Sequence, residues 1–326
     1  MPEKLAGQIW RINIPLENSP LKNLNAYLIR GRSRNLLVDT GYHADSCIAA
    51  MRSALQELRV DMRDTDIFLT HLHSDHCGMA GDIASPDSTV YMSPADDAHL
   101  QSSYAPDFWE RSEKTYLAYG FTEDELAENR KGNPAIAYRQ PEPLPHTPAL
   151  DGQIIDLGGI WLTCLDTPGH TPGHMCLYDE ERGILFAGDH IIYDITPNIT
   201  SWSEMDDALG TYLDSLRRVQ QMDIRMAYSA HRGALGSCAG RIEALLEHHQ
   251  ARLEDALRIL KNSDGLTAYQ TAAGMKWSIR ARNWEEFPVV QKFFAVGEAA
   301  SHLDHLISLG MVSREKVGGK WIYRAR

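Results

Sequence analysis

The chain has 326 residues, of which 43 % are hydrophobic, and a formal net charge of −12. That length suits one large domain with a smaller one, and that hydrophobic share is enough to build a packed core. No apolar run reaches signal-peptide or membrane-spanning length, so we expect a cytoplasmic protein without membrane partners. The five cysteines are an odd number without closely paired spacing, which argues against a disulfide framework and against a thiolate zinc site.

The charge is distributed unevenly along the chain. From Arg241 onward there are 13 Lys and Arg residues and 10 Asp and Glu residues, whereas the first 240 residues hold 19 basic and 34 acidic groups. The strongly negative first part disfavours non-specific attraction to nucleic acid or membranes. The two parts therefore suit different partners.

The first 70 residues predict a layered α/β domain. Alternating or short apolar runs predict three strands before residue 41, the last of them ending at Asp39 before a turn glycine. Residues 45–60 place apolar side chains at helical spacing, with Asp45 as the expected N-cap. Residues 66–70 then form a short buried strand. Strand, helix and strand at this spacing are typical of layered α/β domains.

Residues 93–148 have a mostly helical pattern that interrupts the strands. A capping box is expected at Thr122 and Glu125. The segment is rich in aromatic residues: Tyr104, Phe108, Trp109, Tyr116, Tyr119 and Phe121. These rings are either the apolar face of helices packed on a core or part of a lid that touches substrate over an active site.

Strands resume after residue 152. Residues 158–170 and 173–179 predict hairpin partners, 183–189 a strand that ends in an acid, 207–222 a helix, and 226–233 a strand. We therefore expect a catalytic domain over residues 1–240.

Residues 241–326 change in character. Three helical stretches cover 241–261, 267–277 and 298–310, and residues 311–326 predict a hairpin with a Gly-Gly turn. This order predicts a winged-helix-like accessory domain over 241–326. The four histidines in its helices are expected to be solvated or packing positions: His248, His249, His302 and His305.

A cluster of potential metal ligands follows the strand at 66–70. His71 and His73 lie two residues apart and project to the same side of an extended chain. Asp75 and His76 follow on a loop, where a sharp turn aims them at a second ion. A catalytic zinc ion takes three protein ligands and keeps a position open for water. Four donors within six residues therefore supply half of a two-metal set.

Three further candidates stand at later strand ends. His170, Asp189 and His231 each follow a short apolar strand, and glycines near them suit tight turns. Buried imidazoles clustered without a metal would be left unpaired. The sequence therefore predicts that these donors gather along one edge of the sheets.

These motifs resemble the metallo-β-lactamase superfamily. "THLHSDHCG" fits its H-x-H-x-D-H signature, and "TPGHTPGH", "LFAGDH" and "SAHRG" fit its later ligand motifs in order, over residues from about 8 to 240. The resemblance implies a four-layer αββα sandwich with two metal ions at one edge. It assigns one ion to His71, His73 and His170, the other to Asp75, His76 and His231, and the bridge between them to Asp189.

The resemblance also assigns supporting residues. Asp39 and His174 match positions that orient ligands rather than bind metal, although an acid before a turn glycine is common for structural reasons alone. The C-terminal part resembles the winged-helix domain found in the β-lactamase-like protein 2 group.

The expected activity is binuclear metal-dependent hydrolysis. Two divalent ions, Zn with Fe or Mn as alternatives, lower the pKa of a shared water toward ~7 and so create a metal-bound hydroxide. Asp75 is the expected residue that positions this nucleophile and accepts its proton. No G-x-S-x-G motif offers a serine nucleophile instead.

The residues leave the substrate open. The aromatic segment and the acidic first part favour an ester, thioester or lactone of a small organic molecule. A β-lactamase-like protein 2-type endoribonuclease is the alternative. A non-enzymatic nucleic-acid-binding regulator is disfavoured because residues 298–310 contain no Lys or Arg. Homodimer formation stays open.

Overall fold

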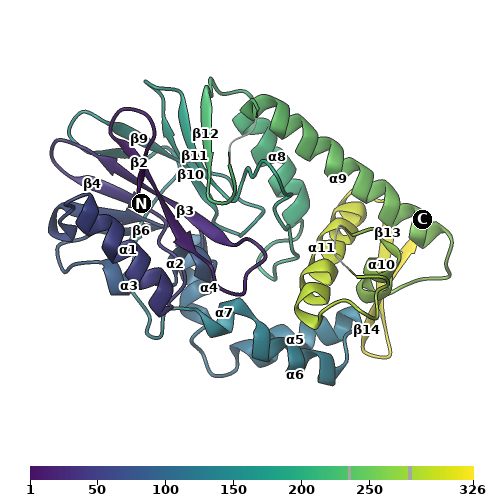
Figure 1. The fold of residues 1–326 in the computed structure, drawn as a ribbon. Coiled ribbons are helices and arrows are strands. Elements are labelled where there is room, and N and C mark those ends of the chain that lie inside the picture. Colours follow the sequence, from purple (N-terminus) through teal and green to yellow (C-terminus); the bar gives the residue numbers. More distant parts are fainter. Residues whose placement is uncertain (234–235, 278–280) are drawn as a thin grey trace. The chain divides into compact units, whose positions relative to one another are not determined.

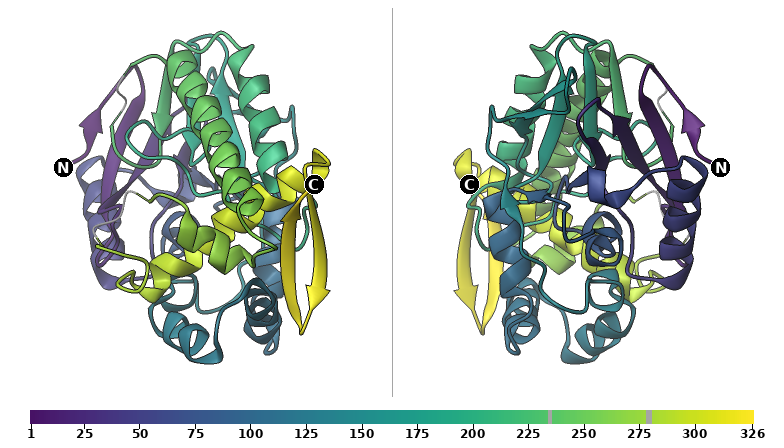
Figure 2. Two further views of the ribbon diagram at one scale, coloured as in Figure 1. Left: turned by 90° about the vertical axis from the view of Figure 1, so that its right-hand side faces the viewer. Right: turned by 90° about the vertical axis from the view of Figure 1, so that its left-hand side faces the viewer.

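The structure is a computed structural model that describes residues 1–233, 236–277 and 281–326. The described residues form two compact units, drawn in Figures 1 and 2. Unit 1 comprises Met1–Ser102, Pro134–Pro197 and Ser215–Ile242. Unit 2 comprises Ser103–Asn133, Asn198–Asp214 and Glu243–Arg326.

The first sheet of unit 1 has seven strands that lie in chain order. The first four pair antiparallel, and the last four pair parallel. The strand Asn23–Arg30 is buried at six consecutive residues, because both faces of the sheet are covered at this point. The strands are β1 (Glu3–Lys4), β2 (Ile9–Pro15), β3 (Asn23–Arg30), β4 (Asn35–Val38), β5 (Thr65–Phe68), β6 (Val90–Met92) and β7 (Thr147–Pro148).

The second sheet of unit 1 has five strands in the order β12-β11-β10-β9-β8. β11 and β12 pair parallel, and the other neighbours pair antiparallel. The predicted hairpin partners are confirmed as β9 and β10. The strands are β8 (Ile154–Asp156), β9 (Trp161–Asp166), β10 (Met175–Asp179), β11 (Ile184–Gly188) and β12 (Met226–Ser229).

The two sheets share one hydrophobic core. Tyr27 and Phe68 from the first sheet lie in the same buried cluster as Leu177 and Phe186 from the second. The rings of Tyr27 and Phe186 meet edge to face at a centroid distance of 5.6 Å. The packed sheets, with helices flanking them, confirm the predicted α/β fold (Figure 1).

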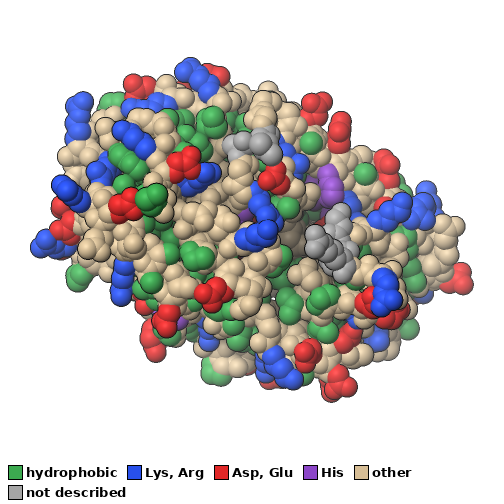
Figure 3. Space-filling view, in the orientation of Figure 1, with side chains coloured by type: hydrophobic (Ala, Val, Ile, Leu, Met, Phe, Trp, Pro, Cys, Tyr) green, Lys and Arg blue, Asp and Glu red, His purple; other side chains and the backbone are tan. Residues whose placement is uncertain are grey.

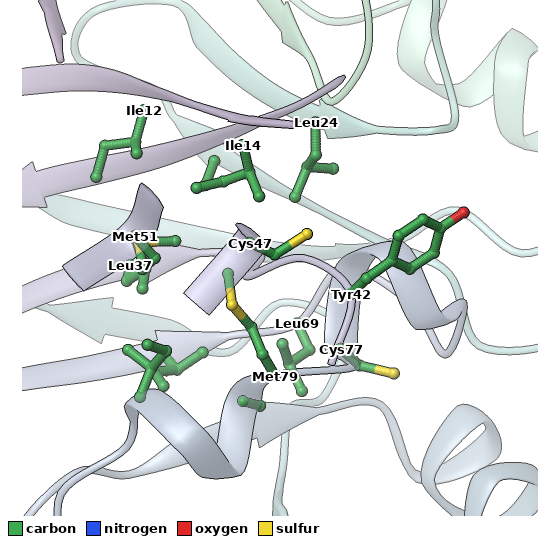
Figure 4. Packing of buried hydrophobic residues seen from close by; sticks show 14 of the residues in the cluster. Ile12, Ile14, Leu24, Leu37, Tyr42, Cys47, Met51, Leu69, Cys77 and Met79 are labelled. Atoms are coloured by element: carbon green, nitrogen blue, oxygen red, sulfur yellow. The ribbon is translucent and has the colours of Figure 1, made fainter. Parts of the chain in front are cut away.

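A second core lies between the first sheet and helix α1 (Asp45–Glu57). Met51 and Cys47 of the helix pack with Ile14 and Leu37 of the sheet, together with Met79 from the loop that follows the histidine cluster (Figure 4). These side chains are almost fully buried. The histidine loop is therefore anchored on a closely packed apolar base.

The start of α1 differs from the prediction. Its N-cap is Ala44, in an extended backbone conformation and without a side-chain hydrogen bond. Asp45 instead lies in the first turn, where a carboxylate interacts favourably with the helix dipole. The predicted N-cap role of Asp45 is therefore wrong by one residue.

Further helices follow in the first half of the chain. In unit 1, α2 (Ser74–Cys77) and α3 (Ala80–Ile83) come directly after the histidine cluster, and α4 (Pro94–Ser102) follows β6. In unit 2, α5 (Phe108–Tyr119) precedes α6 (Glu123–Gly132), and the capping box of Thr122 and Glu125 is confirmed at the start of α6. The short helix α7 (Pro134–Ala137) returns to unit 1.

The remaining helices lie in the second half of the chain. Both α8 (Ala208–Gln220) and α9 (Cys238–Lys261) cross from one unit to the other along the chain. In unit 2 they are followed by α10 (Ala268–Gly274) and α11 (Val289–Ser308).

Unit 2 ends in a two-stranded hairpin of β13 (Val312–Val317) and β14 (Lys320–Ala325). Its turn is the predicted Gly-Gly pair, with φ angles of +57° at Gly318 and +84° at Gly319 that favour glycine. Helices and a hairpin are therefore present in the predicted order, although α11 begins at Val289, well before the predicted start at residue 298. The winged-helix assignment stays a prediction.

All five cysteines are buried and free. No helix in the described part of the chain combines the length with the apolar character that a bilayer crossing would need.

Candidate metal centre

The histidine cluster follows β5, and its second half lies inside a short helix. His71 and His73 precede α2, and His73 is the residue at its N-cap. Asp75 and His76 lie within α2 itself and not on a loop, so that part of the prediction is wrong; the helical turn points them in a different direction from the first two histidines. The chain therefore separates its four clustered donors into two pairs.

The first group of ligand atoms comprises His71, His73 and His170, all within 4.8 Å of one another. Nε2 of His71 lies 3.0 Å from Nδ1 of His73, and Nε2 of His170 lies 3.1 Å from the same atom. His71 and His170 are buried, and His73 is partly exposed. These three imidazoles converge on one point.

The second group comprises Asp75, His76 and His231, whose ligand atoms also lie within 4.8 Å of one another. Oδ2 of Asp75 lies 3.4 Å from Nε2 of His231 and 3.9 Å from Nε2 of His76. All three side chains are buried.

Asp189 lies between the two groups. Its Oδ1 is 3.6 Å from Nε2 of His76 and 3.5 Å from Nε2 of His231, while its Oδ2 is 3.7 Å from Nε2 of His170. One carboxylate thus offers an oxygen to each group. This is the geometry that a bridging ligand requires.

The donor atoms fit divalent metal ions. Nε2 of His76, Nε2 of His231 and Oδ1 of Asp189 are buried without a hydrogen-bond partner. Leaving buried polar atoms unpaired costs free energy, and the cost is offset when those atoms coordinate a cation. Imidazole nitrogen and carboxylate oxygen are ligands that zinc accepts. The buried His/Asp clusters are therefore consistent with a binuclear metal site.

Two of the imidazoles are held by hydrogen bonds at Nδ1, the ring nitrogen that does not face the other donors. Nδ1–H of His76 donates to Asp39 over 2.8 Å, and Nδ1–H of His231 donates to the carbonyl of Asn23 over 2.9 Å. Each bond leaves Nε2 to face the site. Asp39 also accepts from the backbone and hydroxyl of Thr70, and it holds this place at a φ of +60°. The Asp39 carboxylate thus holds the orientation of the His76 ring.

His174 contacts the backbone of the bridging residue. Its Nδ1–H donates to the hydroxyl of Thr167 over 2.8 Å, so its Nε2 accepts the backbone N–H of Asp189 over 3.1 Å. At Gly188, with a φ of +50°, a Cβ would lie 2.7 Å from this same Nε2. His174 therefore fixes the chain at Asp189, and glycine at 188 allows the close approach.

Burial and neighbouring charges set the protonation of the cluster. Burial lowers the pKa of His71 well below its usual value and that of His73 to about 3. Burial alone would lower the pKa of His76, but the carboxylates around it, Asp39 foremost, raise it to about 9. For Asp75, burial acts to raise the pKa, and the adjacent imidazoles outweigh it and hold the pKa well below its usual range. The carboxylates thus favour a positive charge at Nε2 of His76, which a bound cation supplies in place of the proton.

Asp96 is a site residue that the sequence did not single out. It is fully buried and accepts from the backbone N–H of Leu72 (2.9 Å), the hydroxyl of Thr171 (2.7 Å) and the backbone N–H of Gly173 (2.6 Å). Burial raises its pKa to about 6 despite these bonds. Asp96 thus ties the His71–His73 loop to the His170–His174 loop. In the sequence it is only one of two acids in the first turn of a helix, which is an ordinary pattern.

The predicted helical insertion over 93–148 is divided between the units. Its ends, including α4 and α7, belong to unit 1, and residues 103–133 belong to unit 2. In unit 1, the hydroxyl of Ser74 in α2 donates to the carbonyl of Pro134 over 3.1 Å, and Tyr138 stacks on Tyr42 at 4.4 Å. Part of the insertion therefore supports the helix that carries Asp75 and His76. Its role as a lid stays a prediction.

Comparison with known proteins identifies the family. Residues 21–231 match the family model of the metallo-beta-lactamase superfamily. The chain belongs to this superfamily. Within it, this chain carries buried groups of His and Asp residues whose ligand atoms lie close enough together to hold metal ions.

Relatives within the superfamily include lactamase-like proteins of fungi. The chain is 26 % identical over 247 residues to the lactamase-like protein aptB of Emericella nidulans, covering 74 % of this chain and 62 % of that protein. It is 26 % identical over 254 residues to the lactamase-like protein adaB of Aspergillus niger, covering 78 % and 63 %. The chain thus spans less than two thirds of the length of these curated relatives.

Two solved structures are similar over nearly the whole chain. A metallo-beta-lactamase family protein from Thermus thermophilus is 29 % identical with a TM-score of 0.83, covering 98 % of this chain and 99 % of that one. A beta-lactamase domain protein from Burkholderia ambifaria is 22 % identical with a TM-score of 0.86, covering 100 % and 94 %. The second likeness concerns the fold alone.

Proposed function

We propose that this metallo-β-lactamase superfamily member hydrolyses an ester, thioester or lactone bond of a small organic substrate with two divalent metal ions, Zn first among them. The observation that carries the proposal is the position of Asp189, with one carboxylate oxygen toward each group of histidines. When bound, two such ions activate water at neutral pH and polarise the carbonyl under attack.

The residues of the chain bind the ions, orient the ligands and accept a proton. His71, His73 and His170 would hold one ion, while Asp75, His76 and His231 would hold the other. The bonds from Asp39 and Asn23 keep Nε2 of two of these imidazoles aimed at the site. Asp75 stays ionised because its pKa is lowered, so its carboxylate can accept a proton from the attacking water.

The C-terminal part supports a second candidate function. We propose that residues 241–326 act as a winged-helix-like accessory domain to a catalytic domain over 1–240. Its hairpin carries Arg314 and Lys316 over the ring of Trp321, at 4.7 Å and 5.4 Å from the centroid. A basic, aromatic wing favours contact with RNA, as an endoribonuclease would need.

Two observations weigh against the endoribonuclease function relative to hydrolysis of a small acyl substrate. In the helix that would enter a groove, Ala299, Leu303 and Leu306 are buried, and Glu298–Gly310 contains no Lys or Arg. On the face shown in Figure 3, acidic and basic side chains are interspersed rather than gathered into a basic stripe. The same observations weigh against a non-enzymatic DNA-binding regulator.

One experiment separates these functions. The metal content of the purified wild type and of Asp189→Ala is measured first. Both proteins are then assayed for hydrolysis of thioesters, lactones, phosphodiesters and single-stranded RNA. We expect about two equivalents of Zn, Fe or Mn per chain and turnover of an acyl substrate that Asp189→Ala loses. Cleavage of RNA alone would select the endoribonuclease, and near-zero metal would reject both hydrolases.

A further inference from the structure

Unit 1 contains a cavity of about 520 Å³ whose lining holds four arginines and no Asp or Glu. Arg30 ends β3, Arg32 lies in the turn between β3 and β4, Arg59 follows α1, and Arg182 lies in the turn between β10 and β11. Both sheets therefore contribute to the cavity. Four arginines line this one cavity although the first 240 residues carry far more acidic than basic groups.

The cavity lies at the strand ends opposite the metal centre. β3 begins at Asn23, whose carbonyl binds His231, and it ends at Arg30. Likewise β4 runs from Asn35, which lines the cavity, toward Asp39. The length of the sandwich thus separates the arginines from the metal ligands, and the cavity is a distinct site.

Two of the arginines are held in place by other groups. Arg30 donates to the carbonyl of Leu58, and its guanidinium lies 4.9 Å from the ring centroid of Trp10. Arg182 donates to Asp179 over 2.8 Å and lies 3.7 Å from Glu181, so carboxylates of this chain already balance its charge. These contacts reduce the conformational freedom that binding would otherwise have to remove.

The other two arginines keep their charge available. The guanidinium groups of Arg32 and Arg59 form no hydrogen bond or ion pair with any residue in the described ranges. Arg32 lies over Gly159, where a Cβ would come within 3.9 Å of its Cζ. A planar guanidinium presents a fork of donors that matches phosphate oxygens. The two free forks are therefore suited to an anion that enters the cavity.

Arg59 stands where the backbone favours glycine. It follows the C-terminus of α1 with a φ of +53°, and the N–H of Val60 bonds to the carbonyl of Leu55, as in a Schellman motif. A side chain at this position costs conformational free energy. The chain nevertheless places an arginine there, and this residue lines the cavity.

We propose that this arginine-lined cavity binds a small polyanion that carries at least two phosphate groups. One phosphate group for each of the two free guanidinium groups, those of Arg32 and Arg59, supplies the negative charge and the oxygen acceptors that these groups lack. The site is independent of the substrate of the metal centre, so its test does not depend on the proposed hydrolysis.

The test is calorimetric titration of the metal-loaded full chain with inorganic pyrophosphate, with metal content measured before and after. Variants are Arg32→Ala and Arg59→Gly, and the matched control is Arg63→Ala, whose exposed side chain pairs with Asp61 and does not line the cavity. We expect saturable binding that weakens about tenfold or more in each cavity variant and is unchanged in the control. Arg59→Gly should unfold no more easily than the wild type, because glycine suits its backbone.

Three results would overturn the proposal. They are the absence of saturable binding, equal affinity in the cavity variants (which assigns the ligand to the metal centre), and an equal loss in Arg63→Ala (which indicates non-specific charge). Titration with ADP distinguishes the sources of the phosphates. Binding tighter than that of pyrophosphate supports a nucleotide, and weaker binding supports a diphosphate without a base.

Discussion

Both units bury histidines, but they use them differently. In unit 1, Nε2 atoms of His76 and His231 converge with carboxylates and have no hydrogen-bond partner. In unit 2, the fully buried His249 donates from Nδ1 to Nε2 of His302 over 3.2 Å, and His302 donates from Nδ1 to the carbonyl of Glu298 over 2.7 Å. Convergence of three donor atoms, not burial of imidazole, is therefore what distinguishes a metal site from packing.

The carboxylates of the two units also differ in their partners. Asp189 of unit 1 lies within 3.7 Å of the imidazoles of His76, His170 and His231, and its Oδ1 has no hydrogen bond among the described residues. Glu298 of unit 2 pairs with Arg252 at 3.0 Å, and that guanidinium stacks 4.1 Å from the ring centroid of Trp277. A partly buried carboxylate paired with arginine is costly to remove, because the arginine is then left unpaired, whereas a carboxylate directed at imidazoles is available to a cation.

The largest expected effect is loss of the metal centre. Asp189→Ala removes the ligand between the two groups, so we expect metal content to fall below two equivalents and kcat/KM to drop about a thousandfold or more. Inductively coupled plasma mass spectrometry and hydrolysis kinetics measure the two quantities. His302→Gln is the control from unit 2 and should keep both ions. Equal metal loss in the two variants would contradict the contrast between the units.

The next largest effect concerns stability of unit 2. Glu298→Ala leaves the buried guanidinium of Arg252 without its carboxylate, which we expect to lower the free energy of unfolding by about 3 kcal/mol in urea. Glu110→Ala, which breaks an exposed ion pair with Lys114 in the same unit, should change it little. Metal content should stay at two equivalents in both variants, and a fall in Glu298→Ala would show that the units are coupled.

A smaller effect is expected when ligand orientation is disturbed. Asp39→Asn turns a donor or a neutral acceptor toward Nδ1 of His76, so we expect metal affinity to weaken about 10- to 100-fold without loss of the fold. Competition with a chelator measures the affinity, and circular dichroism verifies folding. Asp45→Asn, on the exposed start of α1, is the matched control. Unaltered affinity in Asp39→Asn would reject the orienting role.

The smallest expected effect is a change of the free energy of unfolding with pH. Burial lowers the pKa of His302 to about 3, whereas an unfolded histidine titrates near 6.5. The unfolded state therefore binds the proton first, and the contribution of His302 is complete above pH 6.5 and is lost as the pH falls from there toward 3. Between pH 7.5 and 5.5 the wild type should lose about 1 kcal/mol more unfolding free energy than His302→Gln. Parallel pH profiles would show that the pKa of His302 is not lowered by folding.

Local spacing explains how much of the site was predictable. His71, His73, Asp75 and His76 lie within six residues, so short-range backbone geometry alone brings them together. The hairpin of β9 and β10 and the Gly-Gly turn were predictable for the same reason, because alternation and turn residues act over a few positions.

Long-range contacts explain what was missed. Asp96 is part of the site only because two distant loops, at Leu72 and at Gly173, both direct N–H groups at it. The same holds for the arginine cavity, where turns from both sheets meet although no sequence motif links them. Residues 103–133 likewise join α11 in unit 2, where Tyr116 stacks on Phe293 at 3.8 Å.

The sequence by itself determined the α/β class and the chemical type of the centre, because strand periodicity and donor spacing are local properties of the chain. Only the tertiary structure decided that the two oxygens of Asp189 face different histidine groups, that His174 fixes its backbone, and that buried His249 and His302 pair with each other. Those outcomes depend on the direction of side chains brought together from distant strands and helices. Neither composition nor spacing encodes that direction.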